Sequence, residues 1–215
     1  MRVKRATATG AVLLDGLAAA WSRSEENAIP LAPAPVTLTA AVSLPMAMSQ
    51  GHGAVSALSA RAVHDGETLS IRLAWEDAQK DDRIADLDRF ADAAAVLFPL
   101  LADANPVTMG DEQQPVNAWL WKADRPEAFD VIARGYSTSR RRPARESGLT
   151  ARGLHRDGTW IVVFQRRLRR AGSEFTDFQP GGTSKIAFAV WEGSNAERAG
   201  QKAVSGAFID LELDR

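Results

Sequence analysis

The pattern of apolar and polar positions along the chain predicts β-strands joined by tight turns. Residues 60–75 and 151–168 share one plan, in which a short apolar run and a histidine lead to an Asp-Gly pair and then to an alternating or β-branched run. Asp and Gly tolerate the positive φ angles that tight turns need, so each segment is predicted to be a β-hairpin. Residues 184–193 and 205–214 are predicted to add two more strands, and apolar and acidic residues alternate along the second.

Two other segments are less regular. Residues 28–42 are punctuated by prolines, which predicts an extended edge segment followed by a strand. Residues 86–101 fit either of two structures, because their alanines and leucines favour a helix while an apolar run that stops at Pro99 equally fits a buried strand. No linker rich in glycine and serine divides the chain. Short strands with frequent turns therefore predict one mainly β domain over residues 1–215, an antiparallel β-sandwich with irregular loops and a few short helices.

Composition and charge exclude several classes of function. The net charge of −1 over 215 residues gives no general attraction to nucleic acid, and no apolar run is long enough for a membrane span. The arginine-rich segments 139–146 and 165–170 lack the interleaved aromatic residues of single-strand binders, so we interpret them as a solvated strand edge or a protein-docking patch. The absence of cysteine excludes disulfides, thiolate zinc sites and iron–sulfur clusters held by this chain.

Motifs for organic catalysis are missing from the sequence. There is no zinc-protease helix motif, phosphate loop, Gly-x-Ser-x-Gly elbow or dinucleotide fingerprint. His64 and His155 occupy equivalent hairpin shoulders, which predicts structural roles, and His52 lies between two glycines and is somewhat more open to function. No catalytic residue is predicted.

A methionine loop that leads into a tryptophan strand is the most unusual stretch of the chain. It reads VTMGDEQQPVNAWLWKAD, residues 107–124. Trp119 and Trp121 alternate with Ala118, Leu120 and Lys122, so the tryptophans could simply pack on one face of a sheet. Spacing alone does not separate this packing role from a binding role.

Three segments of the chain together carry a family resemblance. With residues 69–82 (LSIRLAWEDAQKDD) and 184–206 (SKIAFAVWEGSNAERAGQKAVSG), residues 107–124 resemble the haem-binding gamma subunits of the ethylbenzene dehydrogenase family. Relatives there include dimethylsulfide dehydrogenase, selenate and chlorate reductases, and steroid side-chain hydroxylating dehydrogenases. The resemblance covers nearly the whole chain. It implies a single haem-binding β-sandwich domain that holds one noncovalent haem b between a methionine and a lysine.

The resemblance also suggests the two axial ligands of that haem. Met109 stands in the family's Met-Gly loop, whereas Met46 and Met48 lie in an apolar segment and are predicted to be core residues. Lys202 and Lys122 are both candidates for the lysine ligand, and Lys185 is a distant third. Ligands on opposite faces of a haem should come from different segments, which favours Lys202 without excluding Lys122. The cofactor-binding residues expected on this basis are Met109, Lys202, Asn117, Trp119 and Trp121.

The function implied by the resemblance is electron transfer within a larger complex. Electrons would pass from a molybdenum alpha subunit through an iron–sulfur beta subunit to this haem and on to an external acceptor, with molybdopterin and the iron–sulfur clusters in the partner subunits. The substrate is not readable here, although hydroxylation of a hydrocarbon or sterol side chain fits the ethylbenzene branch. The chain has no export signal that we recognise, so we expect periplasmic delivery by co-export with a signal-bearing partner, and a cytoplasmic location without it.

A second class of function is consistent with the predicted fold. A haem-free β-sandwich of the carbohydrate-binding type would use Trp119, Trp121 and Trp160 as stacking platforms. Sandwich folds host both functions, so the fold does not discriminate between them. Exposed tryptophans would favour carbohydrate binding.

Overall fold

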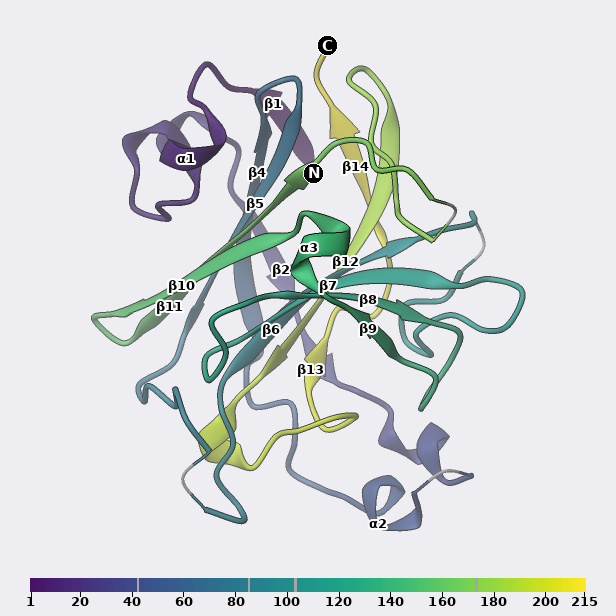
Figure 1. Cartoon of the computed structure of the whole chain (residues 1–215). Helices are drawn as coiled ribbons and strands as arrows, with labels where there is room; N and C mark the ends of the chain where they lie inside the picture. The colour runs from purple at the N-terminus through teal and green to yellow at the C-terminus, as the bar shows by residue number, and fades with distance from the viewer. Residues whose placement is uncertain (42, 85, 103, 173) are drawn as a thin grey trace.

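The strands form one continuous hydrogen-bonded path whose two halves face each other across a shared core (Figure 1). The structure, a computed structural model, describes residues 1–41, 43–84, 86–102, 104–172 and 174–215. Neighbours along the path follow the order β10-β11-β5-β4-β1-β14-β12-β6-β7-β8-β9. The strands are β1 (Arg2–Arg5), β2 (Asn27–Pro30), β3 (Ala32–Pro33), β4 (Ala57–His64), β5 (Thr68–Glu76), β6 (Ala93–Pro99), β7 (Val116–Lys122), β8 (Phe129–Ala133), β9 (Arg140–Arg142), β10 (Thr150–Arg156), β11 (Thr159–Arg167), β12 (Thr183–Trp191), β13 (Ala203–Val204) and β14 (Ile209–Leu213).

Helices are short and lie in the connections. They are α1 (Gly10–Leu13), α2 (Leu44–Ala47), α3 (Ala144–Ser147) and the 3-10 turns η1 (Ala19–Arg23), η2 (Val36–Thr39) and η3 (Gly193–Asn195). Within the described residues, no helix has the length and apolar character needed to cross a bilayer. The prediction of a mainly β fold with a few short helices is confirmed.

Both predicted hairpins are present. In the β4–β5 hairpin, the backbone N–H groups of Glu67 and Thr68 donate to Asp65 Oδ1 at 2.9 and 2.8 Å, so the aspartate side chain closes the turn. In the β10–β11 hairpin, Asp157 and Gly158 have φ angles of 50° and 71°. The Asp-Gly pairs therefore act as the local sequence predicts.

Pairing with distant strands determines the secondary structure of the segment that the sequence left ambiguous, and one predicted strand is absent. Residues 86–101 contain strand β6, which pairs antiparallel with both β7 and β12, and these pairings override the helix propensity of its alanines. The proline segment is extended in β2 and β3, but the strand predicted after it is wrong. A 3-10 turn, η2, forms there, because Thr39 Oγ1 donates to the Val36 carbonyl at 2.6 Å and so stabilises the turn.

The first strand ties the two halves of the sheet together. β1 pairs in parallel with both β4 and β14, an exception within the antiparallel sheet that the sequence predicted. The amino group of Met1 also donates to the Asp210 carbonyl at 2.7 Å. As a result both chain ends are paired into the same part of the fold.

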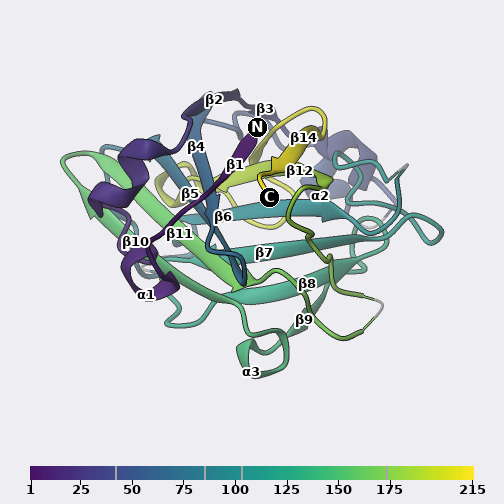
Figure 2. The same cartoon turned by 90° about the horizontal axis from the view of Figure 1, so that it is seen from above.

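Aromatic side chains fill the core between the two halves. Trp75 of β5 and Trp160 of β11 stack with ring centroids 6.3 Å apart, and Trp121 of β7 approaches Trp160 edge-on at 4.9 Å. Phe98 and Trp119 form a second edge-on pair at 4.9 Å. Figure 2 shows β6, β7, β8 and β9 as successive bands beside β5 and β11. Since side chains alternate along a strand, β6 and β7 also have a second face, whose side chains point away from this core.

Candidate functional site

A pocket of about 340 Å³ lies on the face of β12, β6, β7 and β8 that turns away from the aromatic core. Its floor follows the strand register in two rows. One row runs Ala187, Leu97, Ala118, Val131 and Arg141 across neighbouring strands, and the other runs Ala189, Ala95 and Leu120. The four alanines carry short side chains, so they leave space above the sheet. The volume falls in the range of small-molecule and cofactor sites, which is about 300–1,000 Å³.

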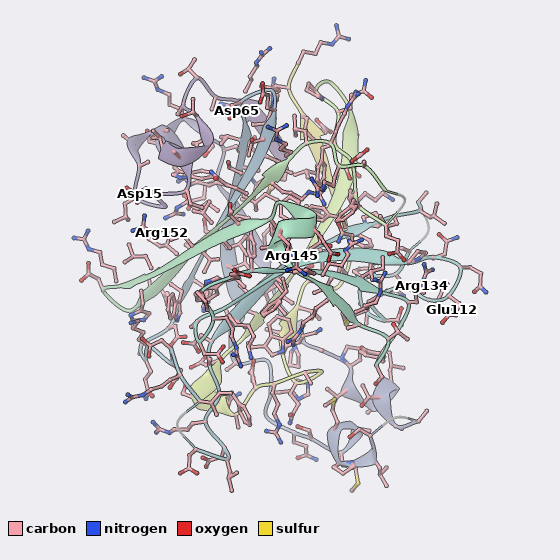
Figure 3. The ribbon with its side chains drawn as sticks, in the orientation of Figure 1. Asp15, Asp65, Glu112, Arg134, Arg145 and Arg152 are labelled. Atoms are coloured by element: carbon pink, nitrogen blue, oxygen red, sulfur yellow. The ribbon has the colours of Figure 1, made fainter. Side chains whose placement is uncertain are left out.

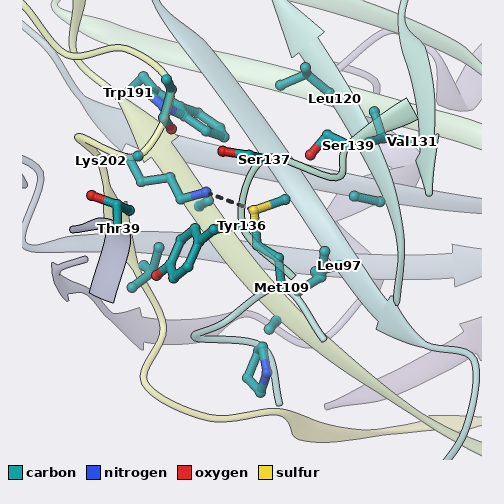
Figure 4. Close-up of a pocket in the computed structure, with 18 of the residues that line it drawn as sticks. Thr39, Leu97, Met109, Leu120, Val131, Tyr136, Ser137, Ser139, Trp191 and Lys202 are labelled. Atoms are coloured by element: carbon teal, nitrogen blue, oxygen red, sulfur yellow. Dashed lines mark hydrogen bonds between the residues drawn. The ribbon is translucent and has the colours of Figure 1, made fainter. Parts of the chain in front are cut away.

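Met109 enters the pocket from a constrained loop (Figure 4). Met109 has φ 61°, an uncommon value for a residue with a Cβ, and Gly110 follows with φ 75°. A Cβ on Gly110 would lie 2.4 Å from the Gln114 carbonyl oxygen, so only glycine fits there. The Gly110 N–H donates to the Asn105 carbonyl at 2.8 Å, and the Gly135 N–H donates to the Met109 carbonyl at 3.0 Å.

Neighbouring side chains hold this loop against the end of β8. The Tyr136 hydroxyl donates to the Val107 carbonyl at 2.7 Å, and its ring lines the pocket. Burial raises the pKa of Tyr136, so the phenol stays protonated. Arg134 donates to the Glu112 carbonyl at 3.3 Å, and the two residues lie side by side in Figure 3. The thioether of Met109 is thus presented by a fixed backbone.

Lys202 reaches the same point from the loop that follows η3. Its side chain is buried, with the residue only 6% exposed, and Nζ lies 3.6 Å from Met109 Sδ. Nζ is also 4.9 Å from the centroid of the Trp191 ring. Among the described residues, no carboxylate forms an ion pair with Lys202. Burial lowers the pKa of the Lys202 amine to about 8 because charge is disfavoured in an apolar environment.

A buried glutamate fixes the loop that carries Lys202. Glu197 is 1% exposed, and its Oε1 accepts from the backbone N–H groups of Gly53 and Ala54 at 2.7 and 2.9 Å. Its Oε2 accepts from the Glu192 N–H at 3.1 Å. The lysine backbone is held as well, since its carbonyl accepts from the Ala34 N–H at 2.9 Å.

Lys202 and Met109, predicted as a pair, are therefore side by side, and the other two lysines are elsewhere. Lys122 is on the pocket face of β7 but beyond the lining, with Nζ 3.7 Å from Asp124 Oδ1. Lys185 is exposed near the far end of β12.

The predicted contacts from Asn117, Trp119 and Trp121 differ from the structure. All three side chains point into the core on the opposite face of β7, and Asn117 Nδ2 donates to Asp130 Oδ1 at 3.0 Å. The pocket face of this strand consists of Ala118 and Leu120 instead. The two-residue period fixes this outcome once the tryptophans are in the core.

The prediction that Met46 and Met48 are core residues is wrong. Met46 lines the pocket, and Met48 is 71% exposed, because η2 and α2 lie in a surface connection rather than in the sheet. The structural roles predicted for His64 and His155 agree with their contacts, and His52, which the sequence leaves more open to function, has a contact of the same kind. Each Nε2 lies within hydrogen-bond distance of a backbone carbonyl, 2.7 Å for His52, 3.0 Å for His64 and 2.8 Å for His155.

Several residues that line the pocket could not be identified as site residues from the sequence. Tyr136, Ser137, Ser139 and Arg141 lie in or beside an arginine-rich stretch whose spacing indicates only a strand edge. A usable signal is the alternation of Ala187 and Ala189 with large apolar residues, because small side chains on one face of a strand leave room for a ligand.

The pocket places a soft sulfur donor, Met109 Sδ, next to the Lys202 amine, whose pKa is lowered by burial. Elsewhere in the described part of the chain, no group of three or more His, Cys, Asp or Glu side chains is placed to hold a metal ion. A thioether and a neutral amine are both ligands for a transition metal. These two side chains fill only two coordination positions of a metal ion, so a bound molecule that carries the ion would have to fill the others.

Comparison with solved structures identifies the fold. A family 9 carbohydrate-binding module of Caldicellulosiruptor kristjanssonii, in complex with glucose, superposes with a TM-score of 0.53 at 11% identity over 100% of this chain and 97% of that one. A candidate carbohydrate-binding protein of Bacteroides uniformis gives 0.54 at 10% identity, over 100% and 98% of the two chains. At such identities the likeness concerns the fold alone.

Comparison of sequences gives closer relatives. The chlorate reductase gamma subunit of Ideonella dechloratans is 36% identical over 156 residues, 72% of this chain and 64% of that protein. The ORF7 protein of Haloferax mediterranei, named as a candidate heme subunit of a respiratory nitrate reductase, is 33% identical over 187 residues, 86% of this chain and 63% of that protein. The dimethylsulfide dehydrogenase gamma subunit of Rhodovulum sulfidophilum is 35% identical over 146 residues, 65% and 54% of the two chains.

The family model described as ethylbenzene dehydrogenase matches residues 18–152 and 144–203, and the second match ends just beyond Lys202. This chain spans under two thirds of the length of each of the three relatives. It belongs to the ethylbenzene dehydrogenase family, among proteins related to the gamma subunits of chlorate reductase and dimethylsulfide dehydrogenase.

Proposed function

We propose that this chain holds one haem b noncovalently between Met109 and Lys202 and serves as a non-catalytic electron-transfer subunit. The observation that carries the proposal is the 3.6 Å approach of Lys202 Nζ to Met109 Sδ inside an apolar pocket. The two side chains come from loops that are far apart in sequence, and each loop is held by its own hydrogen bonds. This arrangement suits a ligand clasped from two sides.

The environment of Lys202 favours metal binding over a purely structural role. A buried lysine without a carboxylate partner costs the fold free energy, so a structural role would be served better by an apolar residue. The lowered pKa, about 8, means that little free energy is needed to expose the amine lone pair near neutral pH. A metal ion would take the place of the proton.

The pocket would also suit a metal that arrives within a macrocycle. Met109 Sδ and Lys202 Nζ, which lie 3.6 Å apart, would hold that metal from two sides after the side chains move apart. The pocket supplies two donors and an apolar floor, which leaves the remaining donors to a flat organic ring. The sequence lacks the Cys-x-x-Cys-His motif of covalent attachment, so noncovalent binding is proposed.

The residues of the pocket suit electron transfer rather than bond chemistry. Haem supplies a one-electron redox centre when bound. The Met109 thioether would favour the reduced form of the metal, the alanine floor would limit access of water, and Met109 and Lys202 would both be occupied in holding the group. The chain's own part is thus to hold the group, set its potential and insulate it.

Carbohydrate binding, named for the structural neighbours, is not supported by the aromatic residues of this chain. Trp119, Trp121 and Trp160 are 0%, 5% and 2% exposed. A stacking platform must be open to solvent, whereas these rings pack in the core. The likeness to sugar-binding modules therefore extends to the fold and not to this surface.

The gamma-subunit names of two relatives support a place for this chain in a multi-subunit complex. We infer that an iron–sulfur beta subunit delivers electrons from a molybdenum alpha subunit, which carries molybdopterin, and that this chain passes them to an external acceptor. The complex is inferred to work in the periplasm, reached by co-export with a signal-bearing subunit.

The experiment is purification of the chain with its partner subunits from a haem-sufficient host. We expect about one haem per chain by pyridine haemochrome assay, sharp α and β bands after dithionite, and reduction by the complex's substrate. A folded but colourless chain in that preparation would overturn the proposal. Calorimetry with glucose and cellotriose on the same sample tests sugar binding, and no heat of binding is expected.

A further inference from the structure

Three consecutive arginines on β9 have different surroundings. Arg140 Nη2 lies 2.5 Å from Glu174 Oε2, and Arg142 is buried in ion pairs with Asp130 and Glu174. Arg141 points to the other face, where it lines the pocket. Within the described chain, Arg141 has no carboxylate in ion-pair range, although both of its neighbours do.

The position of Arg141 relative to Lys202 is set by the sheet. Arg141 pairs with Val131 and ends the floor row at β9, while Lys202 immediately precedes β13 on the other side of β12, β6, β7 and β8. Its guanidinium lies 4.8 Å from the centroid of the Phe129 ring, which holds it beside the pocket. One basic side chain, Lys202, is therefore buried at one side of the floor, and the Arg141 guanidinium is exposed at the other.

The rest of the lining supports an anion at the exposed side. Ser137 and Ser139 line the pocket, close to Arg141 in sequence, and Figure 4 shows Ser139 beside Val131. Their hydroxyls are potential donors to an anion. The described lining contains no Asp or Glu, so nothing in it repels an anion.

We propose that Arg141, with Ser137 and Ser139, forms a carboxylate subsite at the opening of the pocket. Arginine matches the planar carboxylate group with two parallel N–H donors. The inference rests on the proposed haem function, and the carboxylates are then the two propionates on one edge of the ring. The subsite orients the ligand, with its charged edge toward β9 and its apolar edges over the alanines.

Arg140 provides a matched control for the test. It is adjacent on the same strand and exposed, and it points away from the pocket toward Glu174. The haem-loaded protein, purified with its partners, is mixed with excess apomyoglobin, and transfer is followed by absorbance. Arg141→Gln should release haem about tenfold faster than the parent, because a charge-assisted hydrogen bond is lost. Arg140→Gln should match the parent, and Arg141→Lys should lie between.

Esterified haem separates the propionate contact from a general loss of fit. The haem-depleted protein left by the transfer assay is reloaded with haem or with its dimethyl ester, which lacks the carboxylates. With the ester, the parent and Arg141→Gln should release at equal rates and keep the same low-spin spectrum. Equal release of native haem by Arg141→Gln and Arg140→Gln, or a full tenfold difference with the ester, would overturn the subsite. A parent that holds no haem would overturn the proposed function together with it.

Discussion

Replacing Lys202 by Met should stabilise the haem-free chain while removing a proposed ligand. The folded pKa of this lysine is about 8, against an ordinary value of 10.5. Above pH 10.5 the lysine is neutral in both states and does not lower the stability of the fold. As the pH falls from 10.5 to about 8, the unfolded chain binds a proton that the folded chain does not, so the free energy of unfolding decreases and reaches its low value below about pH 8. At 1.36 kcal/mol per pKa unit, the difference makes a penalty of about 3 kcal/mol at pH 7. Methionine has a similar length, carries no charge and adapts to the space.

Urea unfolding of the haem-free proteins measures this penalty. At pH 7 the Lys202→Met variant should unfold at a higher urea concentration, by an amount worth about 3 kcal/mol, and the gain should vanish as the pH approaches 10.5. Lys122→Met is the control and should change stability by less than about 0.5 kcal/mol, since that side chain is partly exposed. In the loaded protein, Lys202→Met should raise the reduction potential, because a second thioether replaces nitrogen. A destabilised Lys202→Met chain, or a gain that does not depend on pH, would refute the reasoning.

Three further outcomes are expected. Met109→Leu keeps the volume, so it should cost less than about 1.5 kcal/mol of stability, while spectroelectrochemistry should show a lower potential or a changed spin state; an unaltered potential would remove Met109 as a ligand. Gly110→Ala should lower the free energy of unfolding by about 1–3 kcal/mol and speed haem loss, because the φ angle is 75° and the added Cβ would meet the Gln114 carbonyl. Thermal or urea unfolding measures the first effect. Gly206→Ala is the matched control, since its Cβ would meet nothing within 4 Å, and it should show neither effect. Disabling the export signal of the partner subunit should keep this chain out of the periplasm in cell fractionation, and an unchanged location would contradict co-export.

Local sequence signals account for much of the sheet but not for its connections. The Asp-Gly pairs at Asp65 and Asp157 determine two hairpins, because their backbone preferences act within a few residues. Strand β6 could not be predicted from its alanines, since it depends on pairing with β7 and β12, which are distant in sequence. The parallel pairing of β1 is likewise a long-range outcome.

The resemblance brought Met109 and Lys202 together but did not show the walls around them. The two side chains are in contact, and their role as ligands stays a prediction. Alternation along β7 showed that Trp119 and Ala118 face opposite ways, but not which face meets the core. That choice depends on the aromatic partners from β5 and β11, so the pocket wall was assigned to the wrong face. Arg141 could not be distinguished from its neighbours without the strand register.

The most direct measurement of the central claim is an anomalous difference map, collected at the iron absorption edge from crystals of the haem-loaded protein. The account predicts one iron peak per chain between Met109 Sδ and Lys202 Nζ, above the floor formed by Ala95 and Ala118. An iron peak at any other place in the chain, or one bound by Lys122 in place of Lys202, would contradict it.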